Sequence, residues 1–247
     1  MAIKISLEEM IDAGAHFGHQ TKRWNPKMAE YIYGEENGVH IFDLVKTKPL
    51  LEKALDFITK SVGEGKTVLI LGTKKQIKDK VAEIAQEVGM PYVNERWLGG
   101  TISNFDQILK SIKKMEEMKA NMASGAYDEY TKKEKLLIDR EIARLERFFG
   151  GIRTLSKVPD VLFVIDTKRE AGAVREANTK RIPVIGIVDT NADPDLVSYP
   201  VPMNDDARSA LEYVLNLVKE AILEGKKSSV SKNTAGKKEA KLSEAKT

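Results

Sequence analysis

Residues Thr67-Val68-Leu69-Ile70-Leu71-Gly72 (TVLILG) decide the fold class. The run is apolar without alternation, which is typical of a strand that is buried on both faces. The residues that follow, up to Gly89, carry apolar side chains at helical spacing, and Gly89 itself is a typical helix stop. A buried strand followed by an amphipathic helix predicts one βα unit of a parallel sheet.

The same unit recurs along the chain. PYVN (91–94), DVLFVID (160–166) and PVIGIVD (183–189) predict three more strands, with a helix over 168–181 between the last two. A final helix is expected from about Asp205 to Glu224. Strands that alternate with helices in this way predict an α/β fold with a doubly wound parallel sheet.

The segment 103–150 has a different, more charged pattern. Apolar residues recur at spacings of three and four on two stretches joined by ASGAYDEYT, and they are Phe105, Ile108, Ile112, Met115 and Met122, then Ile138, Ile142, Leu145 and Phe149. This predicts an inserted antiparallel helical hairpin with the narrow apolar seam of a coiled coil. We interpret the methionines as filler of that seam, not as a cofactor site.

Composition excludes several kinds of protein. The 247 residues include no cysteine, which excludes disulfides, thiolate nucleophiles and Cys-ligated metals and is consistent with a reducing cytosol. Glu8, Glu9 and Asp12 interrupt the N-terminal segment where a signal peptide would need an apolar run, so we expect no signal peptide there. No apolar run approaches the roughly 20 residues that a membrane span needs, and we expect a soluble protein.

Charge divides the chain into regions. The net charge is +3, but the segment 225–247 holds seven lysines and two glutamates, so this end carries +5 and the rest −2. We expect an α/β domain over 1–225, interrupted by the hairpin at 103–150, and a disordered lysine-rich tail over 226–247. The tail either keeps the protein soluble or touches nucleic acid, and the sequence leaves both open.

Motifs of enzymes and of metal sites are incomplete. The end of a P-loop motif at 63–67 lacks its first glycine, because Lys60 stands there, and no G-x-G-x-x-G follows the first strand. Residues 189–195 begin like a calcium loop, but Pro194 and Pro200 replace the glycine and glutamate that the loop needs. A weaker divalent-ion cluster of Asp189, Asp193 and Asp205 or Asp206 stays open beside a role in turns and caps.

Three predicted strands end alike, at Gly72-Thr73, Asp166-Thr167 and Asp189-Thr190. The ends of parallel strands share one edge, where open α/β folds bind ligands, although threonine can also simply cap a helix. Two of these ends are followed by cation pairs, Lys74-Lys75 and Lys168-Arg169. We expect these pairs in the first turn of a helix. Cations are unfavourable there unless an anion binds, and a nucleic-acid backbone is the anion that we favour.

Cations also stand beside both tryptophans, in Lys22-Arg23-Trp24 and Arg96-Trp97, with Lys27 close to the first pair. Such pairs can stack on a base or contact a phosphate, although tryptophan more often closes a core. The neighbouring His16 and His19 lack a third ligand, so we expect no metal site and no cofactor. We expect them instead to end a helix and its turn, with hydrogen bonds to backbone or phosphate.

Four blocks of sequence together resemble the bacterial small ribosomal subunit protein S-two family: AHFGHQTKRWNPKM (15–28), VNERWLGGTISNF (93–105), PDVLFVID with REANTKRIPVIGIVDTNADPD (159–166 and 175–195), and NDDARSALEYV (204–214). The resemblance implies a flavodoxin-like domain with a protruding hairpin and no enzymatic activity. It also implies a cytoplasmic protein of the small ribosomal subunit that contacts ribosomal RNA and neighbouring proteins, and helps to dock the messenger-binding protein S-one.

With that resemblance, the anions are expected to be RNA phosphates, which position a protein without reading sequence. The RNA-binding candidates are Lys22, Arg23, Trp24, Lys27, Lys74, Lys75, Arg96, Trp97, Lys168 and Arg169. Two other functions stay open at this point: an α/β enzyme that binds a nucleotide or sugar phosphate at the strand ends, and a protein-interaction module whose hairpin docks a partner.

Overall fold

The computed structural model describes residues 3–244, with the side chains of residues 3–229. At its centre lies a five-stranded sheet in which all neighbouring strands are parallel. From edge to edge the strands are β5 (Tyr92–Val93), β4 (Val68–Leu71), β6 (Val161–Val164), β7 (Val184–Val188) and β8 (Tyr199–Pro202). Counted along the chain, this is the order 2-1-3-4-5 of flavodoxin-like sheets. The predicted parallel sheet is therefore confirmed.

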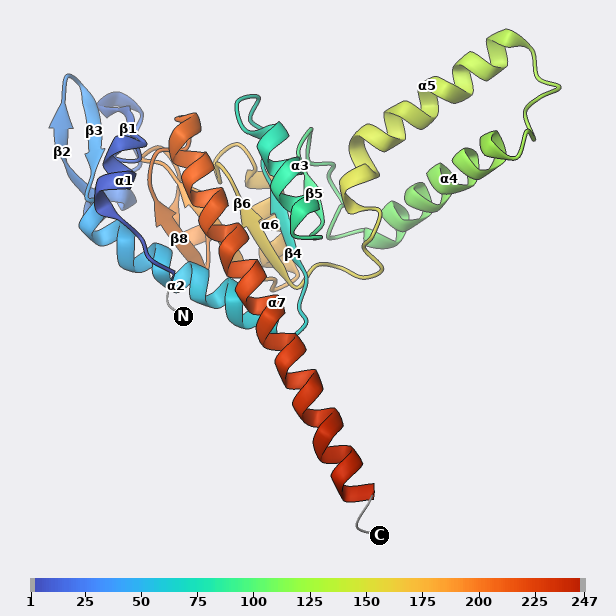
Figure 1. The fold of residues 1–247 in the computed structure, drawn as a ribbon. Helices are drawn as coiled ribbons and strands as arrows, with labels where there is room; N and C mark the ends of the chain where they lie inside the picture. Colours follow the sequence, from blue (N-terminus) through green and yellow to red (C-terminus); the bar gives the residue numbers. More distant parts are fainter. Residues whose placement is uncertain (1–2, 245–247) are drawn as a thin grey trace.

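Helices cover both faces of this sheet (Figure 1). One face carries α2 (Leu44–Gly63), α3 (Lys78–Glu87) and α7 (Arg208–Glu244), and the other carries α6 (Ala171–Thr179). Every residue of β4, β6 and β7 is buried, which explains why these strands read as continuous apolar runs in the sequence.

The N-terminal residues form a small layer that the sequence patterns did not predict. After α1 (Leu7–Asp12) comes an antiparallel sheet in the order β1 (Phe17–Gln20), β3 (Val39–Phe42) and β2 (Ile32–Glu36). The 3-10 helices η1 (Thr21–Arg23) and η2 (Pro26–Tyr31) connect β1 to β2. Asn37-Gly38, both with positive φ, make the two-residue turn of the β2–β3 hairpin, and this dipeptide is a strong hairpin signal.

Two helices begin later than the sequence patterns predict. α3 begins at Lys78 and α6 at Ala171, so Lys74-Lys75 and Lys168-Arg169 precede the helices and do not lie in their first turns. The expectation that these cations oppose a helix dipole was wrong, and their charges need another explanation.

Between β5 and β6 lie α4 (Phe105–Ala123) and α5 (Lys132–Phe149), which pack together and project from the sheet (Figure 1). A capping box of Thr131 and Glu134 starts α5. The seam residues next to the sheet, such as Met115 and Leu145, are buried, whereas Met122 near the far end is 39% exposed. The assignment of these two helices as an inserted coiled-coil hairpin stays a prediction.

The last helix is longer than expected. α7 runs to Glu244, whereas its predicted end is about Glu224. The side chains from residue 230 on lie outside the described residues. The disorder predicted for the tail and the predicted division of the chain into domains are not tested by these observations, and both stay predictions. Among the described residues, no helix is long and apolar enough to cross a membrane.

Candidate nucleic-acid interface

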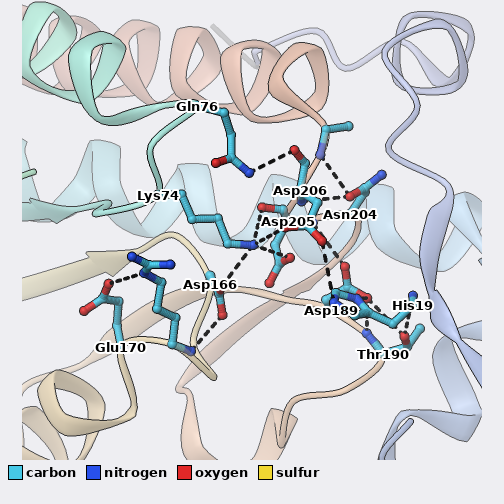
Figure 2. Close-up of polar contacts among 12 residues, drawn as sticks. His19, Lys74, Gln76, Asp166, Glu170, Asp189, Thr190, Asn204, Asp205 and Asp206 are labelled. Atoms are coloured by element: carbon cyan, nitrogen blue, oxygen red, sulfur yellow. Dashed lines mark hydrogen bonds and ion pairs between the residues drawn. The ribbon is translucent and has the colours of Figure 1, made fainter. Parts of the chain in front are cut away.

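The loops that follow the parallel strands bring charged side chains together at one edge of the sheet (Figure 2). Lys74 follows β4, Asp166 follows β6, Asp189 follows β7, and Asp205 and Asp206 follow β8. The sequence prediction that strand ends gather at one edge is confirmed.

The Lys74 ammonium is the centre of this cluster. Its Nζ lies 2.6 Å from Asp205 Oδ1, 2.7 Å from Asp206 Oδ1 and 3.0 Å from Asp166 Oδ2. It also donates to the backbone carbonyl of Asp205, at 2.7 Å. Lys74 is 6% exposed, so its charge is used inside the protein. The place of Lys74 among the RNA-binding candidates stays a prediction, and these internal contacts do not favour it.

His19 joins the N-terminal layer to the same edge. It lies in β1, so the prediction that it ends a helix and its turn was wrong. Its Nδ1 lies 2.9 Å from Asp189 Oδ1, and its backbone N–H donates to Thr190 Oγ1 at 2.9 Å. Beside it, a Cβ on Gly18 would lie 2.6 Å from Thr190 Cγ2, so only glycine fits this close approach.

The charged groups of this cluster shift one another's pKa values. Burial raises the pKa of Asp205 above its usual range, and Asp189 and Asp166 add to this effect. Burial alone would lower the pKa of Lys74, but Asp205 and its neighbours raise it. The hydrogen bond to Asp189 raises the pKa of His19, and burial opposes this rise. Lys74 therefore stays charged and offsets the repulsion among the carboxylates.

Three side chains of this edge could hold a metal ion. Ligand atoms of His19, Asp205 and Asp206 lie within 4.8 Å of one another. Asp193, which the sequence grouped with them, instead binds Lys27 Nζ at 2.8 Å and caps η4 (Pro194–Leu196). The proposed cluster of Asp189 with Asp193 is therefore not formed. In sequence, no spacing rule connects His19 with Asp205, because they lie near opposite ends of the chain.

Exposed cations lie in the segments that carry the cluster and in the loop after β5. Among the described residues, those without an ion pair include Lys22, Arg23, Lys75, Arg96 and Lys168. Lys22 and Arg23 lie in η1, and the residue Asn25 that follows is fixed to the loop after β7 by the hydrogen bond from Asn25 N to Thr190 O, at 2.7 Å. Lys27 is exposed but also binds Asp195, at 2.7 Å. These cations have their charge available for an anion, and Lys27 would have to exchange partners.

The two tryptophans differ in their surroundings. Trp24 is 40% exposed, and its ring lies 5.2 Å from the ring of His40. Trp97 is half-buried, and its Nε1 donates to Glu176 Oε1 at 3.2 Å. Trp24 thus offers more surface to a partner, whereas Trp97 has a fixed ring.

Glu176 organises the loop after β5. Its carboxylate accepts hydrogen bonds from the backbone N–H groups of Gly100 (2.8 Å), Ile102 (3.0 Å) and Ser103 (3.0 Å). The Gly99-Gly100 backbone, expected to approach a partner, is thus bound from within the protein. No sequence pattern pointed to Glu176, because it lies on α6, and the whole of α4, α5 and β6 separates it from this loop along the chain.

The chain is similar to known proteins along most of its length. The profile of the family described as ribosomal protein S2 matches residues 10–225. The small ribosomal subunit protein uS2 of Coprothermobacter proteolyticus is 46% identical over 90% of this chain and 83% of its own length. The uS2 proteins of Corynebacterium diphtheriae and Nocardia farcinica are 45% and 47% identical, over 96% and 90% of this chain and 89% and 78% of their own lengths.

Proposed function

The chain belongs to the ribosomal protein S2 family and is a non-enzymatic constituent of the small ribosomal subunit, and from this premise we propose that it binds small-subunit ribosomal RNA and helps to dock the protein S-one. The RNA would bind at the edge where the parallel strands end. The chain would do so in the cytoplasm, beside neighbouring small-subunit proteins. The nucleotide- or sugar-phosphate-binding enzyme is thereby set aside.

One observation carries the RNA proposal. Lys74 is paired with carboxylates inside the protein, whereas Lys22, Arg23, Lys75, Arg96 and Lys168 are exposed and have no ion pair among the described residues. Phosphates would supply the missing counter-charge, because backbone contacts come mostly from exposed lysine and arginine. The proposed contacts are now Lys22, Arg23, Lys75, Arg96 and Lys168, with Trp24 and Trp97 beside them. Arg169 would use its terminal nitrogens, because its Nε faces Thr73 and Glu170, and Lys27 would have to exchange partners.

A different surface supports the docking of a protein. Near the far end of α4 and α5, Met122, Tyr130, Leu136 and Leu137 are exposed although they are large and apolar. Exposed large apolar side chains in one region of the chain are a feature that protein interfaces share. We therefore place the S-one contact on α4 and α5, and the RNA contact on the edge of the sheet.

Sedimentation tests both parts. A tagged chain from a cell lysate should co-migrate with the small subunit, and RNase should release it. Leu136→Lys with Leu137→Lys should leave this co-migration intact and lower the S-one content of the particles. The matched control is Leu223→Lys on α7, which is also exposed. A free pool at the top of the gradient would contradict RNA binding, and unchanged S-one would contradict the docking surface.

A further inference from the structure

A cleft of about 460 Å³ lies where the order of the sheet reverses, between the loops after β4, β5 and β6. Its lining includes Thr73, Arg96, Trp97, Arg169 and Glu170. Open α/β sheets bind their ligands at this switch point, and small ligands occupy sites of roughly 300–1,000 Å³. The cleft therefore has the place and the size for one small ligand or one nucleotide unit.

The side chains that line the cleft favour an anion. Arg96 is exposed and has no ion pair in the part of the chain that the structure describes. Arg169 uses Nε to donate to Thr73 Oγ1 at 3.0 Å, and its terminal nitrogens make no hydrogen bond with a described residue. Two guanidinium groups in one cleft can bind a phosphate by paired hydrogen bonds.

The acidic residues of the cleft offset only part of these charges, because Glu170 Oε1 lies 3.8 Å from Arg169 Nε and Arg96 has no such partner among the described residues. Glu95 is already bound by Lys78 at 2.8 Å and by Arg147 at 2.7 Å. Glu170 accepts a hydrogen bond from Thr73, and even when it is ionised it offsets only one of the two guanidinium charges. The charge left for a ligand in the cleft is therefore positive.

Trp97 adds an aromatic wall that is held in place by Glu176. The same carboxylate binds the backbone N–H groups of Gly100, Ile102 and Ser103, so this loop offers no amide cradle to a diphosphate. One phosphate on arginines and one base on an aromatic ring is how proteins bind an unpaired nucleotide of RNA.

We propose that this cleft receives one unpaired nucleotide of an RNA strand, with its phosphate at Arg96 and Arg169 and its base against Trp97. The inference rests on the proposed RNA-binding function and adds the state of the RNA that is recognised. A paired nucleotide would keep its base inside the duplex, away from Trp97. Lys75 and Lys168, exposed in the loops after β4 and β6, would bind the phosphates on either side, which favours a strand over a free nucleotide.

The test uses tryptophan fluorescence. The chain has two tryptophans, so Trp24→Phe in the full chain leaves Trp97 as the only indole. Binding of a single-stranded uridine octamer should quench the fluorescence of Trp97, and uridine monophosphate should bind far more weakly. A duplex of the same length should not quench its fluorescence.

Two variants locate the binding site. Arg96→Ala should lower the affinity for the octamer about tenfold, as expected for the loss of one charged contact. Lys180→Ala, which removes an exposed charge before β7, should change the affinity less than twofold.

Three outcomes would overturn the proposal: equal quenching by the duplex, equal affinity for uridine monophosphate, or equal effects of Arg96→Ala and Lys180→Ala. The second would assign the cleft to a free nucleotide. Because Trp24 is itself a proposed RNA contact, both the Trp24→Phe protein and the unaltered chain are sedimented with small subunits. Co-migration without octamer quenching would refute the cleft alone, whereas loss of co-migration by the unaltered chain would refute the proposed RNA binding.

Discussion

Lys74 Nζ lies 2.6 Å from Asp205 Oδ1, and this contact joins the loop after β4 to the loop after β8. The pair is buried, so removal of the lysine would take away the ammonium group that pairs with Asp205, Asp206 and Asp166. We expect Lys74→Met to lower the free energy of unfolding by about 3–5 kcal/mol. Urea denaturation at pH 7 measures this loss.

The neighbouring Lys75 is the control for this prediction. It is exposed and has no ion pair among the described residues, so Lys75→Met should change the free energy of unfolding by less than about 0.5 kcal/mol. Equal losses in the two variants would show that the Lys74 cluster does not stabilise the fold.

Glu176 predicts a pH dependence of the loop at Trp97. Burial alone would raise the pKa of Glu176, but the hydrogen bonds from Ser103, Gly100 and Ile102 lower it below its usual value. An acid whose pKa is lowered on folding stabilises the protein above its unfolded pKa, and this stabilisation is lost as the pH falls through the folded value. The loop should therefore loosen only as the pH falls below the usual titration range of glutamate.

Trp97 fluorescence in a Trp24→Phe background, followed from pH 7 to pH 3, reports this loosening. Glu176→Gln removes the titrating group, so its loop should already be loosened at neutral pH and should lack the acid transition. The same variant should lose about 1–3 kcal/mol of stability, because it leaves backbone donors with poorer partners. An acid transition that persists in Glu176→Gln would assign it to other carboxyl groups.

Gly18 predicts a steric effect between the N-terminal layer and the sheet. The methyl group of Gly18→Ala would lie 2.6 Å from Thr190 Cγ2 and 3.2 Å from the carbonyl oxygen of His40. We expect a loss of about 1–3 kcal/mol in thermal or urea unfolding, which is typical of overpacking. Gly34→Ala in β2 meets nothing within 4 Å and should have little effect.

A double variant identifies the cause of the Gly18 effect. Thr190→Ser deletes Cγ2 but keeps the hydroxyl that accepts from His19 N, so it should recover part of the loss in Gly18→Ala. Without any recovery, the clash with Thr190 would not be what makes glycine necessary here.

The sequence predicted those parts of the fold that short-range patterns specify. The continuous apolar run at Val68–Leu71 can be buried only in a strand covered on both faces, and this was correct. The predicted starts of the helices were less accurate, because the sequence pattern around Lys74 and Lys168 is typical of a first helical turn. The N-terminal strands have neither long apolar runs nor strict alternation, and only Asn37-Gly38 marks their hairpin.

The candidate site could also be predicted only in part. Topology specifies some of its residues, and contacts with distant parts of the chain specify the others. Strand ends must meet at one edge, so Asp166 and Asp189 were found from topology alone. Whether a lysine there points outward or inward depends on residues that are distant in sequence. Lys74 is buried because Asp205 and Asp206 follow β8, the last strand of the sheet along the chain. Glu176 was missed because a carboxylate on an amphipathic helix has the same pattern whether it is solvated or bound to a loop.

The exposed cations predict a salt dependence of RNA binding that separates the edge of the sheet from the rest of the surface. Each phosphate contact that is lost should reduce the slope of log affinity against log salt by about 0.7–0.9. Lys75→Glu with Lys168→Glu should therefore flatten the slope by about 1–2 and weaken binding to a small-subunit ribosomal RNA fragment. Lys53→Glu with Lys60→Glu, two exposed lysines on α2, changes the net charge equally and should leave the slope almost unchanged. Filter binding between 50 and 200 mM salt, roughly the range in which such contacts weaken, measures both slopes. Equal slopes in the two double variants would mean that net charge, and not the position of Lys75 and Lys168, governs the binding.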